Sequence, residues 1–329
     1  MNGADGQVPG EPGAEDDDPG AARHEAGADP TGPGKDPNDP GKNAHGAGAG
    51  ADVPPGVREL LTGPDAPSVQ ALFAAELRRY RVEAKLTQDD LAQRVFCSSG
   101  LVSMIETGRR SPNKDFTKRC DEALGTGGAL LRLWPLLTRE AYPSWFRPFV
   151  EMEATATAIH EFEVQAVPGL LQTADYARTV IGASWPPNSP DETDRQLAAR
   201  LERQEILDRP SPPLLWAVLD ESVLRRPIGT PDVMRAQLKH LLEMADRQHI
   251  RLQIMSFTAG VHAAMDGSYT VIDLPNREHV VYVEGPGGGR LVITPEVVTQ
   301  LRLRFDALRG LALSPEESSA VIAARLGEL

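Results

Sequence analysis

Apolar residues recur at three- and four-residue spacing directly after Ser68, which is the period of an amphipathic helix. The residues on this predicted inner face are Val69, Leu72, Phe73, Leu77 and Tyr80. The hydroxyl of Ser68 can accept a hydrogen bond from a backbone amide in the first turn. We therefore expect a capped helix that begins after Ser68.

Two short helices are predicted next, with a polar break between them. The first begins after Thr87, an N-cap with Asp90 three residues further on, which makes a near-capping box. The second begins after Ser98 and ends at Gly108, because glycine readily adopts the left-handed conformation of a helix end. Their inward residues are Leu91, Ala92 and Val95 in the first helix and Val102 and Ile105 in the second. A fourth and a fifth helix are expected around residues 114–124 and 129–137.

The pattern changes after about residue 140, where strand-like and helical segments alternate. Alternating or short apolar runs bounded by turn residues predict strands at "ATAIHEFEVQAV", "PLLWAVLDE", "IRLQIMSF", "SYTVIDL" and "HVVYVEG". Helical patterns occur in "DYARTVI", "TDRQLAARLERQEILDR", "TPEVVTQLRLRFDALRGLAL" and "SPEESSAVIAARL". The chain is thus predicted to have an all-α five-helix domain followed by a mixed α+β domain.

Residues 1–66 carry no periodic apolar pattern and are rich in Gly, Ala, Pro and Asp. Such a segment buries too little apolar surface to offset its chain entropy, so we expect a disordered acidic tail. Either a solvated extension or an acidic interaction tail fits this composition. The expected organisation is a tail over 1–66, a helical domain over 67–138 and the α+β domain over 139–329.

Charge is distributed unevenly along the chain, whose formal net charge is −13. Residues 1–52 contain eleven Asp or Glu against three Lys or Arg, whereas residues 68–138 contain eleven Lys or Arg against eight Asp or Glu. The helical domain is therefore the part suited to a polyanion.

Several classes of protein are disfavoured by the composition. No uninterrupted apolar run reaches the roughly 20 residues of a membrane helix, and no apolar segment follows a basic N-terminus as in a secretory signal. The two cysteines, Cys97 and Cys120, make neither a disulfide framework nor a metal quartet. We expect a cytoplasmic protein, associated with the nucleoid when bound to DNA, and no membrane partner.

Two short helices joined by a tight turn form a helix-turn-helix, whose second helix enters the major groove of DNA. Small outward residues of that helix would read the bases, the starts of both helices would meet phosphates, and basic residues after it would add charge. The predicted DNA-binding residues are Thr87, Gln88, Ser98, Ser99, Gly100, Ser103, Met104, Arg109, Arg110 and Lys114. The outward side chains are short, so specificity is expected to involve methyl contacts, backbone amides or DNA shape. The expected partner is double-stranded DNA.

At these residues the chain resembles the Cro/C1-type (Xre-like) helix-turn-helix family. The matching residues are Leu86, Thr87, Gln88, Leu91, Ala92, Ser98, Val102, Ser103, Ile105, Glu106, Gly108 and Pro112. The resemblance implies five helices, sequence-specific DNA binding and a structural ion pair between Glu106 and Arg81 of the first helix. One departure is Phe96, where the family usually has Gly. A non-glycine residue costs roughly 1 kcal/mol in a left-handed conformation, so we expect the turn to take another form.

The segments "VPGLLQT" and "LDESVLRRPIG" resemble the C-terminal domain of actinobacterial Scr1-type antitoxin-like regulators, over about residues 140–325. This resemblance implies a transcriptional regulator, often encoded beside a small partner protein. We also expect a homodimer.

No catalytic constellation is visible, so we expect neither an enzyme nor a cofactor. His160 and Glu161 lack the second histidine of a zincin, "EGPGGGR" lacks the Lys and Ser/Thr of a phosphate loop, and no G-x-S-x-G elbow occurs. "EGPGGGR" is expected to be a hairpin loop, and His262 a loop residue. A strand-to-helix junction with an ion pair explains Asp220, Glu221, Arg225 and Arg226 better than a charged active centre.

The aromatic residues Trp145, Phe146, Tyr176 and Trp185 fit core packing or a pocket for a peptide or small molecule.

The sequence thus favours a DNA-binding transcriptional regulator whose C-terminal domain senses a signal or binds a protein. The alternative is a protein-interaction adaptor whose helix-turn-helix module no longer binds DNA. A cytoplasmic enzyme with a regulatory module is a third class.

Overall fold

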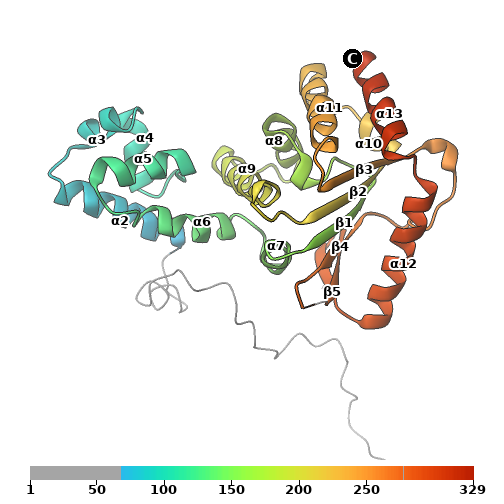
Figure 1. The fold of residues 1–329 in the computed structure, drawn as a ribbon. Coiled ribbons are helices and arrows are strands. Elements are labelled where there is room, and N and C mark those ends of the chain that lie inside the picture. The colour runs from blue at the N-terminus through green and yellow to red at the C-terminus, as the bar shows by residue number, and fades with distance from the viewer. Residues whose placement is uncertain (1–67, 277) are drawn as a thin grey trace, which may run out of the picture. The chain divides into compact units, whose positions relative to one another are not determined.

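The computed structural model describes residues 68–276 and 278–329 (Figure 1). The tail predicted over 1–66 lies outside the described residues. Within the described ranges, no helix is long and apolar enough to cross a membrane.

The N-terminal part is helical, as predicted from its apolar spacing. Its helices are α2 (Val69–Glu83), α3 (Gln88–Arg94), α4 (Ser99–Glu106), α5 (Lys114–Leu124), the 3₁₀ turn η1 (Leu131–Leu133) and α6 (Trp134–Glu140). The predicted fifth helix therefore begins later than expected. Residues 129 and 130 form a turn, and the 3₁₀ turn η1 follows it. Gly127 and Gly128, with positive φ of 63° and 82°, come directly before this turn.

The predicted caps are confirmed. The hydroxyl of Ser68 accepts a hydrogen bond from the amide of Ala71 at 3.2 Å. Thr87 and Asp90 form a reciprocal capping box. Gly108 has a φ of 65° after α4. Ser68 and Thr87 thus satisfy unpaired backbone amides at the starts of α2 and α3, and Gly108 supplies the left-handed backbone after α4.

One prediction about the turn between α3 and α4 is wrong. Phe96 has a φ of 54°, so it adopts the left-handed conformation usual for glycine at this position. Its side chain is 83% exposed. The amide of Cys97 donates to the carbonyl of Ala92 at 2.9 Å and closes the turn. The packing of α4 on α2 and α3 thus imposes the strained backbone.

The C-terminal part contains a mixed six-stranded sheet in the order β3-β2-β1-β4-β5-β6. The strands are β1 (Ala158–Glu163), β2 (Leu214–Asp220), β3 (Ile250–Met255), β4 (Tyr269–Asp273), β5 (His279–Gly285) and β6 (Gly288–Val292). The first three are parallel to one another, because helices connect them, whereas β4, β5 and β6 are antiparallel neighbours.

Helices cover both faces of this sheet. They are α7 (Arg147–Glu153), α8 (Ala174–Gly182), α9 (Pro190–Gln204), α10 (Glu221–Arg225), α11 (Pro231–Ala245), α12 (Pro295–Leu311) and α13 (Pro315–Gly327). Short 3₁₀ turns are η2 (Gly169–Leu171), η3 (Glu205–Asp208) and η4 (Phe257–Ala259). One apolar cluster joins β1–β3 to α8, α11 and α13, and another joins the opposite face to α12. Figure 1 shows α11 and α13 side by side at one end of the sheet.

Three of these elements were not predicted. Strand β6 lies in a glycine-rich segment with no alternation, and α7 is short. Helix α11 could have been predicted from the sequence, because it has apolar residues at helical spacing: Met234, Leu238, Leu241 and Met244, all of them buried.

Candidate nucleic-acid interface

Helix α4 is fixed to the domain by its apolar face. Val102 is fully buried and Ile105 is 2% exposed, in one cluster with Phe73, Leu91 and Phe116. This packing leaves the opposite face of α4 available to a partner.

An ion pair between helices α2 and α4 holds α4 in place. The guanidinium of Arg81 donates to the two carboxylate oxygens of Glu106, from Nε at 2.5 Å and from Nη2 at 2.8 Å. The side chains are 11% and 2% exposed, respectively. The hydrogen bonds that Arg81 donates to Glu106 raise the pKa of Arg81, although burial opposes this. The paired geometry is the one that the family resemblance implied, and the carboxylate of Glu106 points inward, away from the outer face of α4.

Gln88 belongs to the same network. Its side-chain amide donates to Oε2 of Glu106 at 2.8 Å, and Arg81 Nη1 donates to the carbonyl of Leu86 at 2.8 Å. Gln88 is half-buried, and the hydrogen bond of its side-chain amide to Glu106 helps to hold α4 in place. A contact of this amide with a phosphate would require Gln88 to leave Glu106.

The predicted base-facing residues lie on the outer side of α4. Gly100 is exposed, Met104 is 39% exposed, and Ser99 and Ser103 are half-buried. The hydroxyls of Thr87 and Ser98 accept hydrogen bonds within their own helix starts and cap them. The outer face therefore presents small groups and one flexible thioether.

Two of the three predicted phosphate-contacting cations are paired with carboxylates of the C-terminal part. Arg110 Nη2 lies 3.2 Å from Asp194 Oδ2 on α9, and Lys114 Nζ lies 2.6 Å from Glu205 Oε1 on η3. The backbone amide of Ser111 donates to Asp191 Oδ1 at 2.8 Å. Arg109 is exposed. Exposed ion pairs of this kind contribute about 0–1 kcal/mol each, so a phosphate can replace them.

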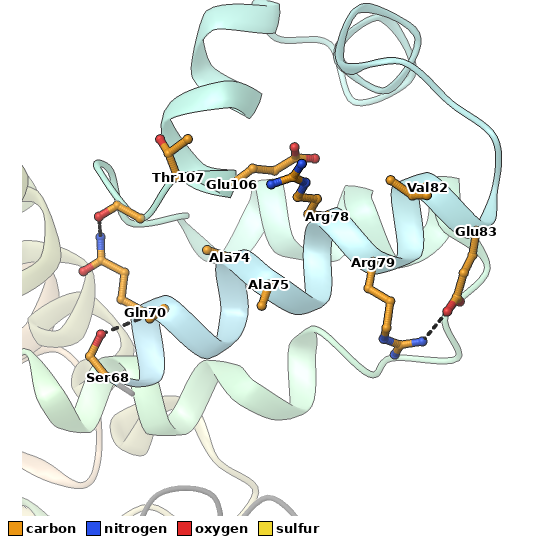
Figure 2. Close-up of a pocket in the computed structure, with 12 residues that line it drawn as sticks. Ser68, Gln70, Ala74, Ala75, Arg78, Arg79, Val82, Glu83, Glu106 and Thr107 are labelled. Carbon is orange, nitrogen blue, oxygen red and sulfur yellow. Dashed lines mark hydrogen bonds and ion pairs between the residues drawn. The ribbon is translucent and has the colours of Figure 1, made fainter. Parts of the chain in front are cut away.

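A second contact connects α9 to the end of α4. Arg195 Nη1 donates to Gln70 Oε1 at 2.8 Å, and Gln70 Nε2 donates to the carbonyl of Gly108 at 3.1 Å. Gln70 lines a groove of about 800 Å³ beside α2, and Figure 2 shows the hydrogen bond that its side chain makes at the end of α4. The small side chains of Ala71, Ala74 and Ala75 form part of the groove.

The other predicted sites have structural explanations. Asp220 caps α10, with the Ser222 amide donating to its carboxylate at 2.9 Å, and Glu221 pairs with Arg225 at 2.7 Å. "EGPGGGR" includes the hairpin between β5 and β6. His160 lies on β1, 3.4 Å from Asp273, and His262 lies in a loop. Among the described residues, no group of His, Cys, Asp or Glu is arranged to hold a metal ion.

The four aromatic residues are separated by the fold. Trp145 and Phe146 line a cavity in the C-terminal part, Tyr176 is fully buried in the core, and Trp185 is 91% exposed. Sequence reasoning missed the charged residues of that cavity, because they come from distant strands and helices.

Two protein-family models match the chain. One, described as a helix-turn-helix domain, matches residues 72–134. The other, described as a domain of unknown function (DUF5753), matches residues 146–324, which is more than half of the chain. Neither the curated proteins nor the solved structures yield a match.

Proposed function

The chain belongs to the family that carries the domain of unknown function DUF5753, here behind a helix-turn-helix domain, and we propose that it is a sequence-specific DNA-binding transcriptional regulator. The observation that carries this proposal is the anchored α4: Arg81 and Glu106 hold its inner face while Gly100 and Met104 remain outside. A helix held in this way can enter a major groove without rearranging.

In the proposed complex, backbone amides at the start of α4 and the short side chains of Ser99 and Ser103 lie at the base edges. Met104 contacts thymine methyl groups. Arg109, Arg110 and Lys114 contact phosphates and supply affinity without sequence information. As predicted from the sequence, we expect the protein to bind as a homodimer.

The C-terminal part is proposed to regulate this binding. Asp194 and Glu205 form ion pairs with Arg110 and Lys114, the cations that phosphates would otherwise contact. DNA must therefore compete with carboxylates of the same chain, and anything that moves α9 changes this competition. The resemblance to Scr1-type antitoxin-like regulators supports a small neighbouring-gene protein as a partner. We propose no catalytic activity and an intracellular location.

The second candidate, an adaptor without DNA binding, is favoured by the same ion pairs. If Arg110 and Lys114 never release Asp194 and Glu205, the basic surface serves only to hold the C-terminal part.

The test is selection of binding sequences from a random duplex library with the full chain, followed by mobility shift. A consensus is expected, and Gly100→Glu should abolish its binding because a carboxylate then faces the bases and phosphates. The fold should tolerate this change, since a Cβ at Gly100 would meet only Ser98 Oγ, at 4.0 Å, and an acid near a helix start is favourable.

Gln248→Glu is the matched control, because it adds the same charge at an exposed position of the C-terminal part. Failure to select any sequence, with Gly100→Glu and wild type indistinguishable, would favour the adaptor.

A further inference from the structure

The C-terminal part contains a cavity of about 370 Å³ between the sheet and helices α7 and α9. Three glutamates lie on the sheet side: Glu161 and Glu163 on β1 and Glu284 on β5. The strand register pairs Glu161 with Thr270, and Thr270 with Tyr282, which brings these side chains to one face of the sheet. We call Glu161, Glu163 and Glu284 the acidic floor.

One wall of the cavity is aromatic. We call this wall, formed by Tyr142, Trp145, Phe146, Phe149 and Tyr282, the aromatic wall. Its rings contact one another: Phe146 and Tyr282 have centroids 5.4 Å apart, and Phe149 and Tyr282 have centroids 4.4 Å apart. Such packed rings give a ligand a rigid apolar surface.

The glycines of the β5–β6 hairpin make room for this wall. A Cβ on Gly288 would lie 3.2 Å from the indole of Trp145, and a Cβ on Gly289 would overlap the hydroxyl of Tyr282. The run "GPGGGR" therefore has a steric function beside the cavity rather than a phosphate-binding one.

Helix α9 contributes two arginines, Arg200 and Arg203, which we call the arginine pair. The side chain of Arg203 is only 10% exposed, and its buried Nε makes no hydrogen bond within residues 68–276 and 278–329. Its one carboxylate neighbour is Glu153, with Nε 3.2 Å from Oε2. Arg200 donates to Gln172 at 2.7 Å, and burial together with the neighbouring Arg203 lowers the pKa of Arg200 to about 10. The Nε atom of Arg203 is thus a buried donor without an acceptor in the described part of the chain.

The acidic floor and the arginine pair share one cavity without direct contact between their charged groups. Within the described ranges, no ion pair of 4.0 Å or less joins them. Burial, with Glu284 nearby, raises the pKa of Glu163 to about 7, and burial raises the pKa of Glu161 as well. Arg203 is paired with Glu153, whereas Arg200 has no carboxylate within 4.0 Å among the described residues, so a ligand carboxylate would supply the partner that Arg200 lacks. A ligand ammonium group would in turn stabilise the ionised forms of Glu161 and Glu163.

We propose that this cavity binds a small zwitterion, with its ammonium group on the acidic floor, its carboxylate on the arginine pair and its apolar part against the aromatic wall. An ammonium group gains both carboxylate contacts and cation–π contacts in this position. The site is independent of DNA binding and stands whether or not α4 reads DNA.

The experiment uses the full chain and four probes of matched shape. L-Phenylalanine and L-phenylalanylglycine are zwitterions with different charge separations, whereas 2-phenylethylamine lacks the carboxylate and 3-phenylpropionate lacks the ammonium group. Binding is measured as the rise in Tm and as tryptophan fluorescence, since Trp145 lies in the wall. At least one zwitterion should bind about tenfold or more tightly than either single-charge probe.

Two variants test the two charged sides. Glu163→Gln and Arg200→Gln should each weaken binding of that zwitterion about tenfold. The matched controls Glu243→Gln and Arg302→Gln change exposed residues on α11 and α12 and should stay within about twofold of wild type. If Arg200→Gln unfolds the chain, Arg200→Lys serves as the second variant. It keeps a positive charge and should retain part of the wild-type affinity.

Three results would overturn the proposal: no zwitterion binds at about 10 mM, single-charge probes bind as well as zwitterions, or Ca²⁺ alone binds and is lost in Glu163→Gln but not in Arg200→Gln. The probe comparison on the wild-type chain decides the question even if every variant is unstable.

Discussion

At the residue scale, two positions of the helix-turn-helix region are held in costly states by their surroundings. Glu106 is a buried carboxylate that receives three hydrogen bonds, two from Arg81 and one from Gln88. Phe96 has a left-handed backbone without being glycine. Neighbouring contacts stabilise the fold by more than each state costs in free energy. Substitution at either residue therefore measures that cost.

Glu106→Ala should lower the free energy of unfolding by about 3–5 kcal/mol, because it leaves the guanidinium of Arg81 buried without its partner. Urea denaturation of both single variants and of the double variant with Arg81→Ala measures the coupling. A folded Glu106→Ala protein of wild-type stability would disprove the structural role of the pair.

Phe96→Gly should raise the free energy of unfolding by about 1 kcal/mol. Glycine adopts φ near 54° without the Cβ clash, and little packing is lost because the ring is 83% exposed. The gain is partly offset by the larger entropy of an unfolded glycine. Thermal denaturation beside Phe96→Ala, which keeps the strain, separates the backbone effect from loss of the ring.

The raised pKa of Glu163 predicts a pH dependence of stability. The folded chain holds this proton up to about pH 7, whereas an unfolded glutamate releases it near its ordinary value of 4.5. Between these values the folded state binds more protons, so its stability falls as pH rises. In Glu163→Gln this decline should be smaller, and urea denaturation from pH 5 to 8 measures it; parallel curves for the two proteins would contradict the shift.

At the scale of elements, α9 and the following η3 carry most of the acidic residues that contact the helix-turn-helix region. Asp191 and Asp194 lie near the start of α9, Glu202 accepts a hydrogen bond from the indole of Trp134 at 2.5 Å, and Glu205 follows on η3. The opposite side of α9 supplies Arg200 and Arg203 to the cavity. One helix thus participates in both proposed binding surfaces.

The double change Asp194→Asn and Glu205→Gln should strengthen DNA binding, because it frees Arg110 and Lys114 for phosphates. Arg110→Ala should weaken binding to all sequences alike and reduce the salt slope by about one unit. Mobility shifts at several salt concentrations measure both effects.

Asp208→Asn is the control for this pair, since Asp208 is also on η3 but contacts Arg247 at 2.7 Å. If the double variant binds DNA no better than this control, α9 does not compete with DNA.

At the scale of the whole molecule, negative and positive charge are concentrated in different segments of the chain. The acidic residues 1–52 precede a helical domain with a surplus of positive charge. Like charge opposes approach to phosphates at low ionic strength, and salt screens this effect.

A chain that begins at Ser68 should therefore bind its DNA at least as tightly as the full chain, with the larger gain at low salt. Comparison of the two chains at 50 and 200 mM salt tests this. A large loss of affinity on removal of residues 1–67 would reveal a contact made by that segment.

The sequence by itself determined the features that depend on neighbours within a few residues. Ser68, Thr87 with Asp90, Ser98 and Gly108 set helix ends through local hydrogen bonds and backbone freedom, so their types and spacing were sufficient. The apolar periods similarly predicted an all-α part followed by a mixed α+β part. The pairing of Arg81 with Glu106 came from family resemblance, since 25 residues separate them and no local pattern connects them.

Only the tertiary structure decided which charges meet. Arg110 and Asp194 are 84 positions apart, and the acidic floor comes from strands β1 and β5 while the arginine pair comes from α9. The conformation of Phe96 was mispredicted for the same reason: local cost disfavours it, but packing around the turn imposes it. Periodicity reports which face of an element is apolar, whereas the partner of a polar group depends on how distant elements pack, and a single sequence does not contain that information in local form.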